Sequence, residues 1–418
     1  MKKYFWHFYR RLNEQLWFKP FIFCVLSVFA ALLAHETDGT FLDDLVPNIK
    51  TKSIEGLLDT ISASMLVISI FAVTSMISAF SAATNTATPR SFKVVVTDDV
   101  SQYALSTFIG SFIFSIVASV ALDNEYYGKS GKFILFLFTL LLFALVILTF
   151  LRWVDRISRL GRLEHTIHQV EKVAARSLSK HIECPFLNAH PIKDSLSNKE
   201  VIKGEEIGYV QHIDVEKLQN IAEENDIQIQ LNCLPGNFIH QNTEIAFCSP
   251  AKDMGHEELT KKINHAIKVG DTRMYADDPR FGFVALAEIA SRALSPGIND
   301  PGTAIQIIGS QERLFYLWNN IDKHRKENKV TCDRVQVPAI ELNEFLDDAF
   351  RPISRYGASN IEVMIRLQRA YDSISQIEHK DLNKSAKKAS EEAYKRAEES
   401  IVFESDLELL KVESLYKQ

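Results

Sequence analysis

The sequence predicts a membrane protein in which four transmembrane α-helices are followed by a cytoplasmic α/β domain with a mainly helical C-terminal part. Three observations support this fold class. Apolar residues are concentrated in the first 154 of the 418 positions. Four stretches in that region are long enough to cross a bilayer, which takes about 20 predominantly apolar residues. The rest of the chain is rich in charged residues and contains both strand-like and helix-like patterns.

The N-terminal region, residues 1–154, contains expected spans at about 18–35, 61–83, 103–122 and 133–154. The last span begins with FILFLFTLLLFALVILTF and is the most clearly apolar of the four. None of the spans carries a charged residue in its middle. Because intramembrane charges are typical of proton relays and voltage sensors, the sequence disfavours a proton pump or a voltage-gated channel.

The charges beside the spans indicate their orientation. Five basic residues lie at or before the start of the first span, and four arginines lie at or after the end of the fourth: Lys2, Lys3, Arg10, Arg11, Lys19, Arg152, Arg156, Arg159 and Arg162. The loop at 35–60 instead holds six acidic residues against two lysines, which suits the outer side. Since lysine and arginine accumulate on the cytoplasmic side, both termini are expected in the cytoplasm.

Residues 155–180 predict a juxtamembrane helix that continues from the fourth span. Leu160, Leu163, Ile167, Val170 and Ala174 follow one another at spacings of three and four, which is the apolar seam of a helix. About two heptads are too few to establish a coiled coil. The seam is therefore expected to pack either on the chain's own cytoplasmic domain or on a partner subunit.

A polar linker then leads to a small α/β module at residues 204–250. EIGYVQHID, IQIQLNCL and TEIAFC resemble strands, VEKLQNIAEEN resembles a helix, and PGNF resembles a turn. Residues 256–377 predict a helical cytoplasmic domain, because helical apolar spacing recurs through them. Residues 378–418 are charged and helix-prone, so a solvated helical tail, or a frayed one, is expected there.

Two membrane spans contain stripes of hydroxyl side chains. At 100° per residue, four polar residues of the second span fall in one narrow wedge and are candidates to line a pore: Thr74, Ser78, Ser81 and Asn85. Helix packing is the alternative, because small hydroxyl residues are common where membrane helices meet. The third span repeats a small residue every four positions, at Thr107, Ser111, Ser115 and Ser119, and this stripe is expected to serve packing.

The stretch ALSPGINDPGTA, residues 293–304, joins two apolar helical patterns. Ser295, Pro296 and Gly297 are suited to end the first helix, because proline disfavours a helical residue before it and glycine accepts a positive φ. Asp300 is placed to be the N-cap of the second helix, and Pro301 fits the first turn of that helix. Turn formation alone therefore explains the residue types of the SPGINDP loop, residues 295–301.

Neighbouring charges leave a second interpretation of this loop open. Arginines beside a helix N-terminus outline an anion site, because amide N–H groups and positive charge converge there. The structural alternative is that a carboxylate such as Glu288 neutralises the arginine. Arg292 is expected near the loop in both cases. The candidate ligand-binding residues are Arg273, Asp278, Arg280, Arg292, Ser295, Asn299, Asp300, Arg351 and Arg355.

Several chemistries find no support in the sequence. Ser295 has no adjacent histidine and no G-x-S-x-G context, so no catalytic residue is assigned and an enzyme is the less favoured class. The twelve histidines show no metal-binding spacing, and the five cysteines contain no C-x-x-C pair. No metal, no cofactor and no nucleic-acid partner is therefore expected.

Four longer motifs resemble a known family. They are TPRSFKVVVTDDVSQYALSTFIGSFIF, PGNFIHQNTEIA, DPRFGFVALAEIASRALSPGINDPGTA and RPISRYG. Together they are similar to predicted bacterial membrane proteins catalogued as a domain of unknown function, over nearly the whole chain to about residue 375. The resemblance implies a bacterial origin, four membrane helices and a cytoplasmic domain, and it brings no activity. A location in the bacterial inner membrane is therefore expected. The positions that match its signatures are Pro89, Arg90, Gly110, Gly236, Phe238, Asp278, Pro279, Phe281, Gly282, Arg292, Ser295, Pro296, Gly297, Asn299, Asp300 and Pro301.

Two functional hypotheses follow. The first is a homo-oligomer in the lipid bilayer whose membrane part conducts or gates, controlled by a cytoplasmic domain that senses an anionic small molecule. It rests on the hydroxyl wedge of the second span and on the large soluble domain. The second is a membrane-anchored scaffold or regulator without transport activity, and it rests on the absence of ionisable residues in the middle of the spans.

Overall fold

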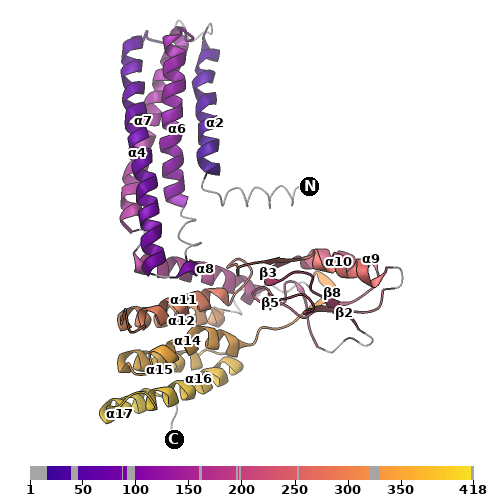
Figure 1. Ribbon diagram of the computed structural model, residues 1–418. Coiled ribbons are helices and arrows are strands. Elements are labelled where there is room, and N and C mark those ends of the chain that lie inside the picture. The colour runs from indigo at the N-terminus through magenta and orange to yellow at the C-terminus, as the bar shows by residue number, and fades with distance from the viewer. Residues whose placement is uncertain are drawn as a thin grey trace. The chain divides into compact units, whose positions relative to one another are not determined.

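A computed structural model describes residues 17–38, 46–86, 88–91, 99–159, 162–193, 196, 199–251, 254–320 and 330–415 (Figure 1). It divides into two compact units, Met1–Thr166 and Ile167–Gln418. In the described part of the chain, four helices are long and apolar enough to cross a membrane: Phe18–Thr37, Thr51–Ala82, Val100–Asp123 and Lys129–Arg159. They cover the four expected spans except for residue 83.

The first unit is a helical bundle arranged around one central helix. Its elements are α2 (Phe18–Leu33), η1 (Ala34–Thr37), α4 (Thr51–Thr86), α6 (Asp99–Asp123) and α7 (Lys129–Arg159). Helix α6 contacts α2, α4 and α7. Its hydroxyl stripe explains this position, because Thr107, Ser111 and Ser115 are buried and small residues let neighbouring backbones approach.

Two further details confirm that the stripe on α6 serves packing. The hydroxyls of Thr107 and Ser111 donate to the carbonyls of Tyr103 and Thr107, at 2.9 and 2.6 Å. A side chain added at Gly110 would place its Cβ 3.1 Å from the Cβ of Phe23 on α2. The hydroxyls of Thr107 and Ser111 are thus satisfied within their own helix, and the absence of a side chain at Gly110 allows the close contact with α2.

Helix α8 (Leu163–Glu183) is separate from α7, which ends at Arg159. The sequence predicted one continuous helix, whereas residues 160 and 161 between the two helices lie outside the described residues. Ile167, Val170 and Ala174 of the expected seam are buried within the second unit. This burial supports packing of the seam on the chain's own domain. Leu160, the first residue of the seam, lies outside the described residues.

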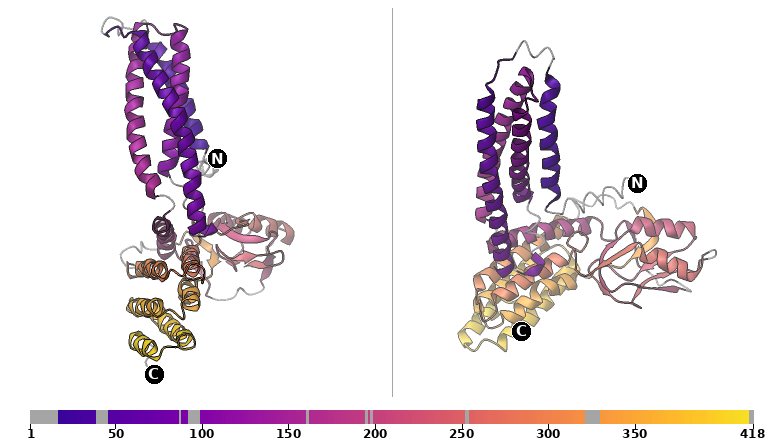
Figure 2. Two further views of the ribbon diagram at one scale, coloured as in Figure 1. Left: turned by 60° about the vertical axis from the view of Figure 1, so that its left-hand side comes forward. Right: turned by 45° about the horizontal axis from the view of Figure 1, so that its top comes forward.

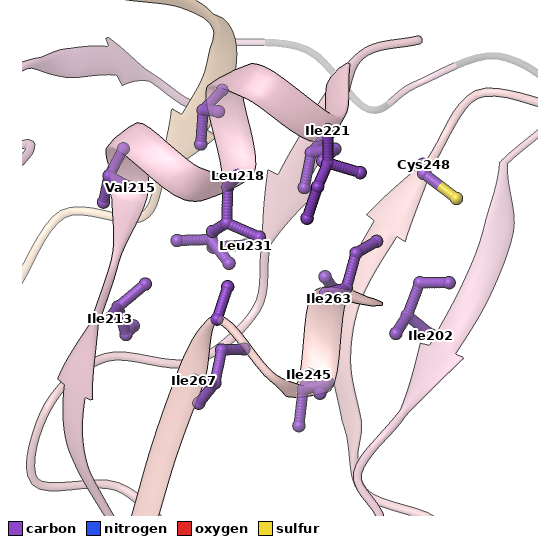
Figure 3. Close-up of a cluster of buried hydrophobic side chains, with 14 of the residues drawn as sticks. Ile202, Ile213, Val215, Leu218, Ile221, Leu231, Ile245, Cys248, Ile263 and Ile267 are labelled. Carbon is purple, nitrogen blue, oxygen red and sulfur yellow. The ribbon is translucent and has the colours of Figure 1, made fainter. Parts of the chain in front are cut away.

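The second unit begins with an α/β module built on two sheets. The five-stranded sheet has the order β1-β8-β4-β6-β2 and the three-stranded sheet the order β5-β3-β7. The strands are β1 (Ala189–Pro191), β2 (Glu200–Lys203), β3 (Gly208–Ile213), β4 (Ile229–Leu231), β5 (Phe238–Ile239), β6 (Glu244–Cys248), β7 (Ile267–Gly270) and β8 (Cys332–Val337). Helices α9 (Val215–Glu224) and α10 (His256–Asn264) complete the module. Its apolar core includes Leu218, Leu231 and Ile245 (Figure 3).

The module extends beyond the expected range of 204–250. Strands β7 and β8 come from residues that the sequence placed in the helical domain. Strand β8 pairs in parallel with both β1 and β4, after the chain has left the module to form α11 and α12. A parallel neighbour is reached through a long crossover connection, so local sequence patterns around β8 do not reveal its partners.

The C-terminal helices form a two-layer array (Figures 1 and 2). Their bounds are α11 (Phe281–Ala293), α12 (Pro301–Phe315), η2 (Tyr316–Asn320), α14 (Leu342–Tyr356), α15 (Ile361–Ser375), α16 (Lys380–Glu398) and α17 (Glu404–Glu413). Helices α11, α14 and α16 contact one another in succession, and so do α12, α15 and α17. Each helix therefore packs on the helix two places further along the array, as in α-solenoids.

The C-terminal segment is part of this array, which corrects the expectation of a solvated or frayed tail. Leu382, Ala386 and Ala397 of α16 are fully buried. The buried hydroxyl of Ser390 bonds the side-chain carbonyl of Gln368 on α15 at 2.5 Å, and the Gln368 amide donates to the carbonyl of Ser390 at 3.1 Å. The sequence analysis missed this packing because residues 378–418 are highly charged and the buried face of α16 is a narrow stripe rich in alanine and serine. This stripe packs against α14 and α15.

Candidate functional site

Asp278 is the centre of a buried charge cluster at the start of α11. Its carboxylate accepts hydrogen bonds from Nε and Nη2 of Arg273 at 2.6 and 3.0 Å. It also accepts from the backbone N–H groups of Arg280 and Phe281, both at 3.1 Å. Only 2% of Asp278 is exposed. Burial raises the pKa of this carboxyl, while the bonds from Arg273 and the amides oppose that effect.

The neighbouring carboxylate, Asp277, faces different partners. It accepts a hydrogen bond from Nζ of Lys180 on α8 at 2.5 Å and lies 2.8 Å from Nδ1 of His212 on β3. Burial disfavours its ionisation, but the bonds from His212 and Lys180 outweigh burial and lower its pKa to about 2. The two adjacent carboxylates thus bind different partners, and Asp277 links α8 to the sheet.

Two glycines allow the chain to close around this cluster. Gly236 in the PGNF turn has φ +96°, and a Cβ there would lie 2.3 Å from Oδ2 of Asp278. A Cβ on Gly282 would lie 2.2 Å from the Cβ of Ala174 on α8. Both positions therefore need glycine, because any side chain would collide with its neighbour. The family-like residues Gly236, Asp278 and Gly282 form one junction between the module, α8 and α11.

Arginine pairing completes the junction. Nε of Arg280 donates to Oδ2 of Asp348 at 2.6 Å, and its guanidinium also pairs with Glu344. The guanidinium of Arg273 lies 5.3 Å from the ring centroid of Phe281. Arg273 and Arg280 are thus each paired with carboxylates. This pairing favours the structural interpretation of both arginines over anion binding.

The SPGINDP loop lies at the opposite end of α11 from this cluster. Helix α11 has 13 residues, so about 20 Å of helix separates the two ends at 1.5 Å per residue. Arg351 pairs with Asp347 at 2.5 Å, and Arg355 is exposed near the end of α14. The structure therefore does not bring the candidate ligand-binding residues together into one site. Arg292 does lie near the loop, since its carbonyl accepts from the hydroxyl of Ser295 at 2.7 Å.

The geometry of the loop matches a capped turn. The carboxylate of Asp300 accepts from the N–H of Thr303 at 3.1 Å and from its hydroxyl at 2.6 Å, and Pro301 occupies the first turn of α12. Asn299 has φ +49°, a conformation that asparagine tolerates better than most residues. Its N–H donates to the carbonyl of Ser295 at 2.8 Å. Pro296 to Asn299 form an exposed tip.

Asp300→Ala is expected to destabilise the second unit by about 0.5–2 kcal/mol, because it removes the N-cap of α12. The bonds from Thr303 lower the pKa of Asp300, so the cap's contribution is present near neutral pH and is lost as pH falls through that lowered pKa. Denaturant unfolding of the two proteins at pH 7 measures the difference. An unchanged midpoint would contradict the capping role.

The carboxylate of Asp277 is also expected to stabilise the fold in a pH-dependent way. Its pKa lies near 2 in the folded protein against an ordinary value of 3.8, so its contribution is complete above about pH 4 and is lost as pH falls through 2. The difference between these two pKa values corresponds to about 1–2 kcal/mol of free energy of unfolding after allowance for solvent screening. Unfolding measured from pH 6 to pH 2 should show a smaller loss of stability in Asp277→Asn than in the unaltered chain. Equal losses would contradict the assignment.

The sequence did not identify several partners of the junction. Lys180, His212, Glu344 and Asp348 lie 64 to 97 positions from their partners in the chain, so sequence spacing could not reveal them. Only the closeness in sequence of Arg273 and Asp278, five positions apart, indicated that two members of the junction could pair. Among the described residues there is no cluster of three histidine, cysteine or acidic residues that could hold a metal ion.

The pore-lining candidates occupy one side of α4. Thr74, Ser78 and Ser81 are exposed in the single chain. The hydroxyl of Thr74 donates to the carbonyl of Ile70 at 2.9 Å. The side chain of Asn85 lies outside the described residues, although its backbone belongs to α4. The wedge is therefore not used for packing within its own bundle, unlike the stripe on α6.

Comparisons with known proteins agree with the membrane-spanning helices. The model of a family described as "Predicted membrane protein (DUF2254)" matches residues 13–373. Uncharacterized proteins of Mycobacterium bovis and Mycobacterium tuberculosis are 24% identical over 177 residues. The match covers 40% of this chain and 33% of each relative, so only about a third of the relatives' length is represented. No solved structure matches.

Proposed function

Because the chain belongs to the family of predicted membrane proteins named DUF2254, we propose that it is an integral inner-membrane protein that assembles as a homo-oligomer. Its membrane part conducts or gates, and its soluble region is a cytoplasmic ligand-sensing domain. Both termini are cytoplasmic, which follows from the arginines after the fourth span and the acidic loop before the second.

The observation that carries this proposal is the position of the hydroxyl wedge on α4. The helix packs on its own bundle through Ile61, Met65, Ala72 and Met76, which are buried. At 100° per residue, these lie on the side roughly opposite to Thr74, Ser78 and Ser81. Hydroxyl groups turned away from the bundle gain a polar environment when copies of α4 assemble around a shared, hydrated path.

The paired substitution Ser78→Leu with Ser81→Leu tests the path. We expect it to reduce potassium or chloride flux from proteoliposomes by at least about tenfold, since leucine removes polar groups that lower the barrier. Leu141→Ser is the control, because Leu141 is also exposed but lies on α7. Flux is measured with ion-selective electrodes, and the number of subunits by light scattering.

Three outcomes separate the alternatives. A loss of flux with unchanged assembly supports conduction along the hydroxyl face. A monomeric chain without potassium or chloride flux contradicts the channel and leaves the membrane-anchored scaffold. A flux unaffected by the paired substitution contradicts the assignment of Thr74, Ser78 and Ser81 to the path.

A further inference from the structure

A cavity of about 800 Å³ lies within the second unit, and its lining shares no residue with the junction around Asp278. It is bordered by the end of α8, by the segment from β8 into α14, and by the first half of α16. Its volume falls within the range of about 300–1,000 Å³ that is typical of small-molecule sites. Its lining combines an apolar part with a charged part.

The apolar part is rigid and partly aromatic. It includes Phe186, Trp318 and Leu346. Trp318 is 7% exposed and is held between rings, with its centroid 5.6 Å from that of Phe315 and 5.2 Å from that of Phe345. A rigid aromatic lining can bind the apolar body of a ligand with little loss of side-chain freedom.

The charged part lies on one face of α16. Asp381, Lys384, Lys388 and Glu392 follow at spacings of three and four and all line the cavity. Within the described residues, the ion pairs do not include any of these four. Arg351 on the facing helix is already paired with Asp347 at 2.5 Å. The face of α16 thus presents two ammonium groups and two carboxylates that can bind a ligand, and Glu341 adds a further carboxylate to the lining.

Charges of both signs restrict the kind of ligand. A purely anionic molecule would pair with Lys384 and Lys388 but would shield Asp381 and Glu392 from water without a partner. A purely cationic molecule would have the converse effect. Both arrangements carry a desolvation penalty. A molecule that carries a cationic and an anionic group on an apolar body satisfies both sets of side chains.

The cavity also touches α8. His181 and Ile182 of that helix are part of the lining. Burial lowers the pKa of His181 to about 4, so its imidazole is neutral near pH 7 and adds hydrogen-bonding capacity without charge. The cavity is thus lined in part by the helix that follows the fourth span in the chain.

From this arrangement we infer that the cavity lined by α8, α14 and α16 binds a small zwitterion with an apolar body. The inference deepens the ligand-sensing part of the proposed function. The sensing site is then the cavity and not the SPGINDP loop. The ligand carries both a positive and a negative charge and is not a simple anion. It depends neither on conduction nor on the number of subunits.

Three peptide probes with one apolar body test the inference. They are leucyl-phenylalanine, its N-acetyl derivative, which keeps only the negative charge, and its C-terminal amide, which keeps only the positive charge. Binding to the full chain in nanodiscs is measured by equilibrium dialysis, with empty nanodiscs as the blank. The free dipeptide is expected to bind at least about tenfold more tightly than either blocked probe.

Substitutions on α16 assign the binding to the cavity. Lys384→Gln with Lys388→Gln, and separately Asp381→Asn with Glu392→Gln, should each weaken binding of the free dipeptide by at least about tenfold. The matched control is Lys387→Gln with Lys395→Gln on the same helix, away from the lining, which should leave the affinity within about twofold.

Three results would overturn the inference: equal binding of the three probes, no binding of the free dipeptide at about 10 mM, or equal effects of the cavity and control pairs. Ion flux in the absence of any peptide is unaffected by these results. Failure of the cavity and failure of the conducting membrane part are therefore distinguishable.

Discussion

Gly282→Val is expected to separate α8 from α11 and to destabilise the second unit severely. A Cβ at this position would lie 2.2 Å from the Cβ of Ala174 and 2.9 Å from its Cα, so backbone as well as side chain would have to move. Overpacking typically costs about 1–3 kcal/mol where side chains can adjust. Because Ala174 has no rotamer to change, we expect a cost at or above the upper end of that range.

Hydrogen exchange of the full-length protein measures this effect locally. Amides of α8 and α11 should exchange at least about a hundredfold faster in Gly282→Val, which corresponds to about 3 kcal/mol of lost protection. Gly297→Ala is the control, because no atom lies within 4 Å of the Cβ position in the exposed SPGINDP tip. If both variants exchanged like the unaltered chain, close packing of α8 on α11 would be contradicted.

Sequence reasoning identified those parts of the fold that depend on local patterns. The four spans, the packing stripe of α6 and the cap at Asp300 each follow from spacing within one helix or one turn. Strand β8 could not be placed in the same way, since its neighbours β1 and β4 lie far away in the chain. Helix α16 was missed because its buried face consists of small residues, which carry little hydropathy signal.

For the candidate ligand-binding residues, too, the sequence indicated local groups of residues but not their distant partners. Arg273, Asp278 and Arg280 were recognised as a group of charges, but the partners of Arg280 on α14 were not visible, nor were the partners of the adjacent Asp277 on β3 and α8. Without those partners, the arginines looked available to an anion. The charged face of α16 was visible as alternating charges, yet only the fold shows that it borders an apolar lining.

Breaking the pair between Arg273 and Asp278 is the second large effect expected. Arg273→Met leaves the Asp278 carboxylate, which is 2% exposed, with only two backbone N–H donors. Asp278→Ala leaves the Arg273 guanidinium, which is 18% exposed, without this carboxylate and also removes the acceptor of the N–H groups at the start of α11. Removing one partner of a buried ion pair costs about 3–5 kcal/mol, because the remaining charge stays desolvated.

An exposed pair of the same residue types provides the comparison. Nη1 of Arg334 donates to Oδ1 of Asp226 at 2.8 Å, but the Asp226 side chain is 72% exposed. Arg334→Met should therefore leave the denaturation midpoint nearly unchanged, while Arg273→Met lowers it strongly. Combining Arg273→Met with Asp278→Ala should cost less than the sum of the two single losses, because no unpaired buried charge remains. If Arg273→Met behaved like Arg334→Met, or if the two losses simply added, the junction would not depend on this pair.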